Sequence, residues 1–233
     1  MIVGVFVTTA EAVENLPGQL SACISLKTPG NNSRQYPLTF LESASGKGCF
    51  SLEASQELPL VITERVRNQS DCWEMEVTLT ALDDIYFNFS QQFSTSFRHG
   101  DCQFYMPGFW YRQNLRSPQG APAFHTSDSW EVREDRLSTP LTGIYNVKDG
   151  QYLTVIRKDE FCHDALTTHS EGEVILSGKT SIGFTGFANH NGKATLSFGF
   201  PYREAPKSYV RKLTLAPEVE AYQKLGKGET VML

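Results

Sequence analysis

The residues best suited to chemistry lie in one mid-chain segment, residues 104–141. It begins FYMPGFWYRQNLRS and continues PQGAPAFHTSDSWEVREDRLSTPL. Aromatic rings attract the polarised C–H bonds on the apolar face of a sugar ring, and arginine, amide and carboxylate groups form directional hydrogen bonds with sugar hydroxyls. This mixture of residue types is therefore typical of carbohydrate recognition. The candidate ligand-binding residues are Trp110, Tyr111, Arg112, Arg116, His125, Asp128 and Trp130.

The same composition also fits a purely structural role. Large aromatic side chains in a long loop often form a small core that fixes the loop, with Arg–Glu pairs on its outside. For any single aromatic residue of the segment this packing interpretation is the favoured one. For the segment as a whole a functional role is favoured, because long ordered loops inside compact domains are uncommon and usually serve a function.

Catalysis is the weaker hypothesis for this segment. Its candidate acid–base pairs are Asp128 with Glu131, or Glu134 with Asp135, since glycoside hydrolysis uses two carboxyl groups at a fixed separation across a cleft. Closeness in sequence does not supply that geometry, and WEVREDR also reads as an ordinary charged strand edge. We therefore expect no catalysis by this chain alone.

No cofactor or metal is expected either. His163 and His169 lie near Cys162 without the spacing of a zinc site. The chain has no Gly-rich dinucleotide motif, no phosphate loop and no Gly-x-Ser-x-Gly nucleophile elbow. The five cysteines are widely spaced and odd in number, which favours free thiols over a disulfide framework.

Composition restricts the partners of the chain. A formal charge of −5 argues against nucleic-acid binding, which normally requires a basic face. No apolar stretch is long enough to cross a bilayer as a helix. The N-terminal MIVGVFVTTAEA lacks the positive residues of a signal peptide and is interpreted as a first strand. Carbohydrate is the expected partner, and an extracytoplasmic location is the expectation.

The rest of the chain predicts an all-β fold. Alternating or β-branched runs recur throughout, as in LVITERVRN and WEMEVTLTAL, and are separated by turn-forming residues. Asp149-Gly150 and Asn191-Gly192 each lie between two such runs and predict tight hairpins. Only short pieces such as residues 216–226 have a helix-favouring composition. We therefore predict one antiparallel β-sandwich over residues 1–233, with at most a few short helices.

The start of the mid-chain segment carries a local prediction. Phe104 and Tyr105 are expected to end a strand and to point inward. Pro107 and Gly108 are then expected to turn the chain outward, because proline fixes φ and glycine relaxes it. This would bring the aromatic and arginine residues that follow to a concave surface.

Taken together, these features resemble the N-terminal β-supersandwich domain that precedes the (α/α) toroid of certain glycosidases and related lyases. The resemblance rests on the nearly pure β character, on the Trp-, Arg- and acid-rich segment ending in LTGIYN, and on the C-terminal YVRKLTLAPEVEAYQKLGKGETVML. It implies a non-catalytic, carbohydrate-associated domain whose loop reaches the sugar or a neighbouring cleft. It also implies a C-terminal catalytic domain outside this chain, of which this chain would be the N-terminal part.

Two other interpretations stay open. A free-standing enzyme of the aldose-epimerase type has a related fold and uses histidine with a carboxylate, but its arrangement does not map onto His125, His163 or His169 in this sequence. The chain could equally be a plain sugar-binding or structural module. A helical continuation of the reading frame would favour the toroid-associated domain, and mutarotation by the isolated chain would favour the epimerase.

Overall fold

The fold is known from a computed structural model, which describes residues 2–7, 18–43, 47–69, 71–112, 129–158, 171–206, 208–211, 214–216 and 218–233. Only the backbone is described for residues 2–7, 110–112, 208–211 and 214–216. All statements about side chains below concern the remaining described residues.

Strands dominate the described chain, and its only helical elements are two 3-10 turns, η1 (His99–Asp101) and η2 (Glu134–Arg136). The strands are β1 (Ile2–Val7), β2 (Gly18–Lys27), β3 (Arg34–Glu42), β4 (Cys49–Glu53), β5 (Leu60–Asn68), β6 (Cys72–Ala81), β7 (Ile85–Arg98), β8 (Cys102–Met106), β9 (Trp110–Arg112), β10 (Trp130–Arg133), β11 (Leu141–Asn146), β12 (Gln151–Lys158), β13 (Gly172–Ile175), β14 (Phe184–His190), β15 (Lys193–Phe200), β16 (Arg203–Glu204), β17 (Ser208–Arg211), β18 (Thr214–Ala216), β19 (Val219–Leu225) and β20 (Thr230–Met232).

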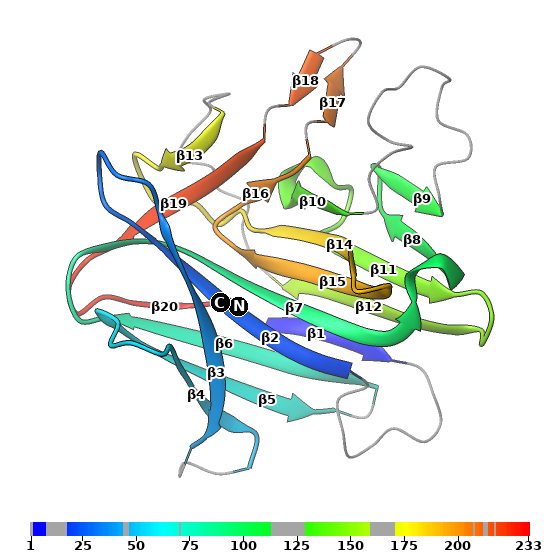
Figure 1. The fold of residues 1–233 in the computed structure, drawn as a ribbon, viewed down its shortest axis with the longest axis horizontal. Coiled ribbons are helices and arrows are strands. Elements are labelled where there is room, and N and C mark those ends of the chain that lie inside the picture. Colours follow the sequence, from blue (N-terminus) through cyan, green and yellow to red (C-terminus); the bar gives the residue numbers. More distant parts are fainter. Residues whose placement is uncertain are drawn as a thin grey trace.

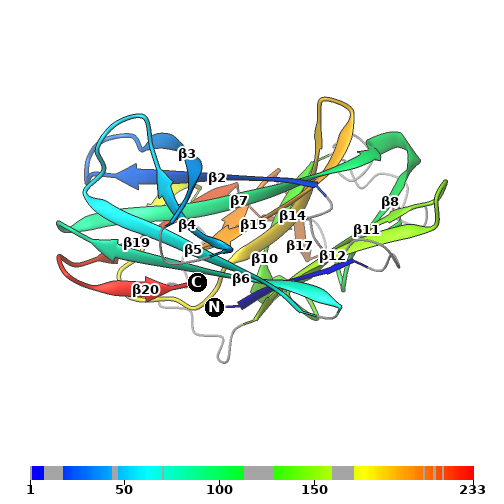
Figure 2. The same ribbon diagram turned by 90° about the horizontal axis from the view of Figure 1, so that it is seen from below.

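The strands form two layers that face each other (Figure 2). The first layer runs in the order β9–β8–β11–β12–β1–β6–β5–β4–β3, with β20 also pairing with β6. The second runs β2–β7–β15–β14–β10, with β19 pairing with the start of β7. Because β3 pairs with both β4 and β2, it joins the layers along one side (Figure 1). The predicted antiparallel β-sandwich is confirmed.

Sequence alternation and turn chemistry explain these elements locally. Along β6, buried and half-buried residues alternate strictly, so one face of the strand joins the core. Asn191 and Gly192 have φ values of 53° and 80° and close the β14–β15 hairpin, as predicted. Asp149 and Gly150 lie in the turn of the β11–β12 hairpin, where Gly150 has a φ of 69°. The predicted first strand corresponds to β1.

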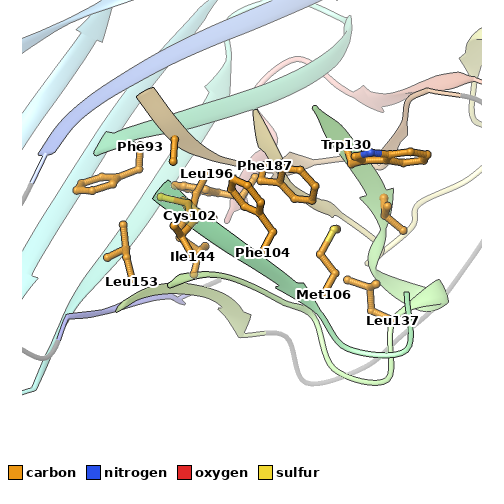
Figure 3. Close-up of a cluster of buried hydrophobic side chains, with 14 of the residues drawn as sticks. Phe93, Cys102, Phe104, Met106, Trp130, Leu137, Ile144, Leu153, Phe187 and Leu196 are labelled. Atoms are coloured by element: carbon orange, nitrogen blue, oxygen red, sulfur yellow. The ribbon is translucent and has the colours of Figure 1, made fainter. Parts of the chain in front are cut away.

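A polar bridge between the layers separates two of the three apolar clusters formed by the described residues. Glu64 of β5 and Gln91 of β7 are both 2 % exposed, and Gln91 Nε2 donates a hydrogen bond to Glu64 Oε2 at 2.6 Å. On one side of the bridge lies a cluster that includes Phe89 and Ile62. On the other side lies the cluster of Figure 3, which includes Phe93.

One local prediction about secondary structure is wrong. The helix-favouring stretch 216–226 contains the strand β19, which pairs with β13 in parallel and with β16 and β7 in antiparallel register. Ala221 and Tyr222 are fully buried there, so sheet pairing and burial outweigh the weak helix propensity of the segment. Within the described residues, no helix has the length and apolarity needed to span a membrane.

Candidate functional site

The mid-chain segment begins with a hairpin, β8–β9, at one end of the first layer (Figure 1). Its turn is closed by a hydrogen bond from the Phe109 amide to the Met106 carbonyl at 2.9 Å. Gly108 has a φ of 81°, and a Cβ there would lie 2.7 Å from Ser138 Oγ. The Ser138 amide also donates to the Pro107 carbonyl at 2.9 Å. The predicted Pro-Gly turn is therefore present, and residues from the far end of the segment hold it.

The two residues before this turn point in opposite directions. The Phe104 ring is 4 % exposed and stacks on Phe187 with ring centroids 4.2 Å apart (Figure 3). The Tyr105 side chain is 44 % exposed, so the prediction that it points inward is wrong. Successive residues of a strand face opposite sides of the sheet, and with Phe104 in the core Tyr105 must lie on the outer face.

Trp130 is a core residue in this structure. Its side chain is 1 % exposed and lies in the cluster of Figure 3. The ring meets the Phe109 ring edge to face, with centroids 5.6 Å apart. The guanidinium group of Arg136 lies over the Phe109 ring, with its carbon atom 5.3 Å from the ring centroid. Trp130 thus fixes the end of the segment beneath the hairpin, while a ligand-contacting role for it stays a prediction.

The charged residues that follow Trp130 form ion pairs. Glu134 and Arg157 are buried, with Arg157 Nε 2.5 Å from Glu134 Oε1, and the Gly183 amide donates to Glu134 Oε2 at 2.9 Å. Arg136 pairs with the buried Glu204. Buried ion pairs can fix the position of a chain segment. These two pairs connect the WEVREDR segment to Arg157 of β12 and to Glu204 of β16.

Arg133 completes this arrangement. Its guanidinium makes two hydrogen bonds with the Asp135 carboxylate, at 3.0 and 2.8 Å, and its carbon lies 4.0 Å from the centroid of the Tyr202 ring. Glu134, Asp135 and Glu204 are therefore each paired with an arginine.

Glu131, the described member of the candidate pair Asp128 and Glu131, lies on the outer face of the second layer. In register it is opposite Gly186, which is in turn opposite Ser197. A Cβ at Gly186 would lie 2.7 Å from Ser197 Oγ and 3.0 Å from Glu131 Cα. The absence of a side chain at Gly186 gives the Glu131 side chain room beside Ser197.

The surroundings of Glu131 raise the pKa of its carboxyl group. Burial raises the pKa of the Glu131 carboxyl, Arg203 acts to lower it, and Glu220 raises it further. Arg203 is itself committed to Glu220, with Nη2 2.5 Å and Nε 3.1 Å from Oε1, and it also lies over the Phe184 ring. A carboxyl group of this kind could donate a proton, but it shares one arginine with a second carboxylate in a structural network.

For the other predicted site residues, the structure describes either the backbone alone or nothing. Trp110, Tyr111 and Arg112 form β9, for which the backbone is described, and they lie opposite Met106, Tyr105 and Phe104 respectively. Arg116, His125 and Asp128 lie outside the described residues, so the separation of Asp128 and Glu131 is not tested. Cys162, His163 and His169 also lie outside them. Among the described residues, no group of three or more His, Cys, Asp or Glu side chains could hold a metal ion.

Sequence reasoning missed two tyrosines on the outer face of the first layer. Tyr145 of β11 and Tyr152 of β12 are 43 % and 44 % exposed and lie directly opposite each other. They are close to Tyr105 because β8 pairs with β11. The signal available in the sequence was the Asp149-Gly150 turn, which fixes which residues of the two runs face each other.

Comparisons with protein-family models, with curated proteins and with solved structures find no match for this chain.

Proposed function

We propose that this chain is a non-catalytic, carbohydrate-associated β-sandwich domain of a glycoside-processing enzyme. Its β8–β9 hairpin and the segment that follows would contribute to sugar recognition, either directly or by completing the cleft of a neighbouring catalytic domain. The fold analogy that suggested this role gives only a prior expectation.

One observation supports the proposal most strongly. The candidate residue Tyr111 pairs in register with Tyr105, whose side chain is 44 % exposed on the outer face of the sheet. The β8–β9 hairpin therefore presents the exposed ring of Tyr105 at the entrance to the aromatic and arginine-rich segment, with the backbone of Tyr111 opposite it.

The ion pairs at the end of the 104–141 segment, after Trp130, support a non-catalytic role. The carboxylates of Glu134, Asp135 and Glu204 are each bound to an arginine of the chain. A catalytic carboxyl group must reach a substrate atom. These groups instead hold the end of the segment in place.

The test combines a binding assay with a turnover assay. The purified chain is run in native gels containing soluble polysaccharides, and the release of reducing sugar from the same polysaccharides is measured. We expect at least one polysaccharide to retard the chain and none to be cleaved. Trp110→Ala should weaken binding by at least about tenfold, or ~1.4 kcal/mol, with the melting temperature almost unchanged.

Three results would contradict the proposal. Retardation by no polysaccharide would contradict direct sugar recognition by this chain. Turnover that is lost in Asp128→Asn or Glu131→Gln would make the chain a glycosidase, and mutarotation of free sugars would support the epimerase alternative. A loss of about 3–5 kcal/mol of stability in Trp110→Ala with unchanged binding would show that Trp110 only packs.

A further inference from the structure

Three exposed tyrosines gather on one face of the first layer. Tyr105, Tyr145 and Tyr152 are 43–44 % exposed, and no other Phe, Tyr or Trp among the residues with described side chains is classed as exposed. Exposed hydrophobic side chains scattered singly over a surface need no explanation, but a contiguous group of them often marks a binding site. We call the surface formed by these three residues the tyrosine face.

The strand register makes the tyrosine face continuous. Tyr145 lies directly opposite Tyr152. Tyr105 lies opposite Gly143, two residues before Tyr145, which is the diagonal position that aromatic side chains reach across a sheet. A Cβ at Gly143 would lie 3.9 Å from Tyr105 Cβ and 3.3 Å from Thr154 Oγ1, so glycine leaves a shallow recess between the side chains of its neighbours.

The tyrosine face is also extended. Its residues lie on the consecutive strands β8, β11 and β12, which Figure 1 shows side by side at one end of the molecule. Neighbouring strands are about 4.8 Å apart, so the row from β8 to β12 spans about 10 Å. That length exceeds a single sugar ring.

An open hollow of mixed polar and apolar lining adjoins the tyrosine face. Its volume is about 390 Å³, and it is lined by Gly100, Asp101, Cys102, Gln103, Val147 and Lys148. Gln103 lies directly opposite Tyr145, which connects the hollow to the tyrosines. The charges nearby balance, because Lys148 is followed by Asp149 and Asp101 lies 4.0 Å from Arg98. A side-chain amide and balanced charges beside aromatic rings suit a neutral, hydroxyl-rich ligand.

We propose that the tyrosine face binds a neutral, extended glycan along β8, β11 and β12, with more than one sugar ring in contact and with the adjoining hollow receiving groups at one end. Tyrosine presents an apolar ring and a hydroxyl, so it stacks on sugar rings and also forms hydrogen bonds with their hydroxyls. This inference rests on the proposed function. It adds the ligand class, a linear neutral glycan, and it assigns a surface outside the 104–141 segment.

Isothermal titration calorimetry tests this inference. The ligand is the longest available oligosaccharide prepared from a polysaccharide that retards the chain in the native gels. The variants are Tyr145→Ala, Tyr152→Ala and the double substitution. Val61→Ala is the matched control, because Val61 is 46 % exposed on a distant strand of the same layer. We expect the double variant to lose at least about tenfold in affinity, the control to match the wild type, and affinity to rise with oligosaccharide length.

Two checks concern the thermal stability of the variants and the need for an aromatic ring at position 145. Melting temperatures should stay within about 4 °C of the wild type, because substitutions at exposed positions usually change stability little. Tyr145→Phe keeps the ring and should keep most of the affinity. Tyr145→Gln keeps a polar side chain without the ring and should lose affinity as Tyr145→Ala does.

The outcomes separate this inference from the proposed function. If the wild type binds no glycan, both fail. If the wild type binds glycan, Trp110→Ala abolishes binding and the double tyrosine variant binds normally, the tyrosine face is overturned while the proposed function stands. Self-association of the wild type in sedimentation that disappears in the double variant, with glycan affinity unchanged, would show instead an interface between two copies of the chain.

Discussion

The buried carboxyl group of Glu64 makes the stability of this chain fall as the pH rises. Glu64 bridges the two layers in the core, where burial raises its pKa from 4.5 to about 8 and the hydrogen bond from Gln91 acts to lower it. Below pH 4.5 the group is protonated in both the folded and the unfolded chain, so it causes no pH dependence. Between 4.5 and about 8 the unfolded chain loses the proton while the folded chain keeps it.

The size of the effect follows from this pKa difference. The free energy of unfolding should fall by about 1.4 kcal/mol per pH unit across that window, which amounts to roughly 4 kcal/mol between about pH 5 and pH 8.5. Above the folded-state pKa both states are ionised and the fall ends. Glu64→Gln keeps the shape of the side chain and removes its proton equilibrium. The variant should therefore be close to the wild type at the lower pH and clearly more stable at the higher one.

Urea unfolding followed by circular dichroism at the two pH values measures this difference. Other titrating groups are common to both proteins and cancel when the variant is compared with the wild type. Glu57→Gln, at an exposed position, is the matched control and should show the wild-type pH dependence. Parallel loss of stability in the wild type and Glu64→Gln, with a difference that stays within about 1 kcal/mol at both pH values, would refute the reasoning.

Three further predictions concern the packing of the same chain. Trp130→Ala should lower the free energy of unfolding by about 3–5 kcal/mol, because the ring is fully buried, and a small thermal shift would contradict the packing assigned to it. Arg157→Met should cost about 3–5 kcal/mol by leaving Glu134 buried without its cation, and adding Glu134→Gln should recover part of that loss; equal stability of the single and double variants would contradict the pairing. Burial raises the pKa of Cys102 to about 11, so its alkylation followed by mass spectrometry should be slow in the native chain and fast in urea, whereas rapid native alkylation would show an accessible thiolate.

Much of the fold could be predicted because local sequence and tertiary structure agree. The alternation of WEMEVTLTAL is reproduced as the alternating burial of β6, and Asn191-Gly192 forms the tight hairpin that this pair favours. The prediction for residues 216–226 was wrong because a short segment with weak propensity takes the structure of the sheet around it. Glu64 did have a signal that was not used: in LVITERVRN it lies two residues after Ile62 and two before Val66, so strand alternation places it on their core-facing side.

The candidate site was less predictable because it depends on pairings between distant residues. Tyr105 lies close to Tyr145 only because β8 pairs with β11, about 40 positions later in the chain. The burial of Trp130 depends on Phe109 and on the core cluster beneath it. Composition identified the segment that combines aromatic and charged residues, but composition alone does not separate rings that pack from rings that face solvent.

The most direct test of the central claim is a nuclear magnetic resonance titration of the chain, labelled at its tyrosine rings and backbone, with an oligosaccharide from a polysaccharide that retards it. The account predicts saturable shifts at Tyr105, Tyr145 and Tyr152 and at the Gln103 amide, with Glu131 and its neighbours on the second layer unaffected. Shifts confined to the Glu131 and Arg203 region, or no saturable shifts with any glycan, would contradict it.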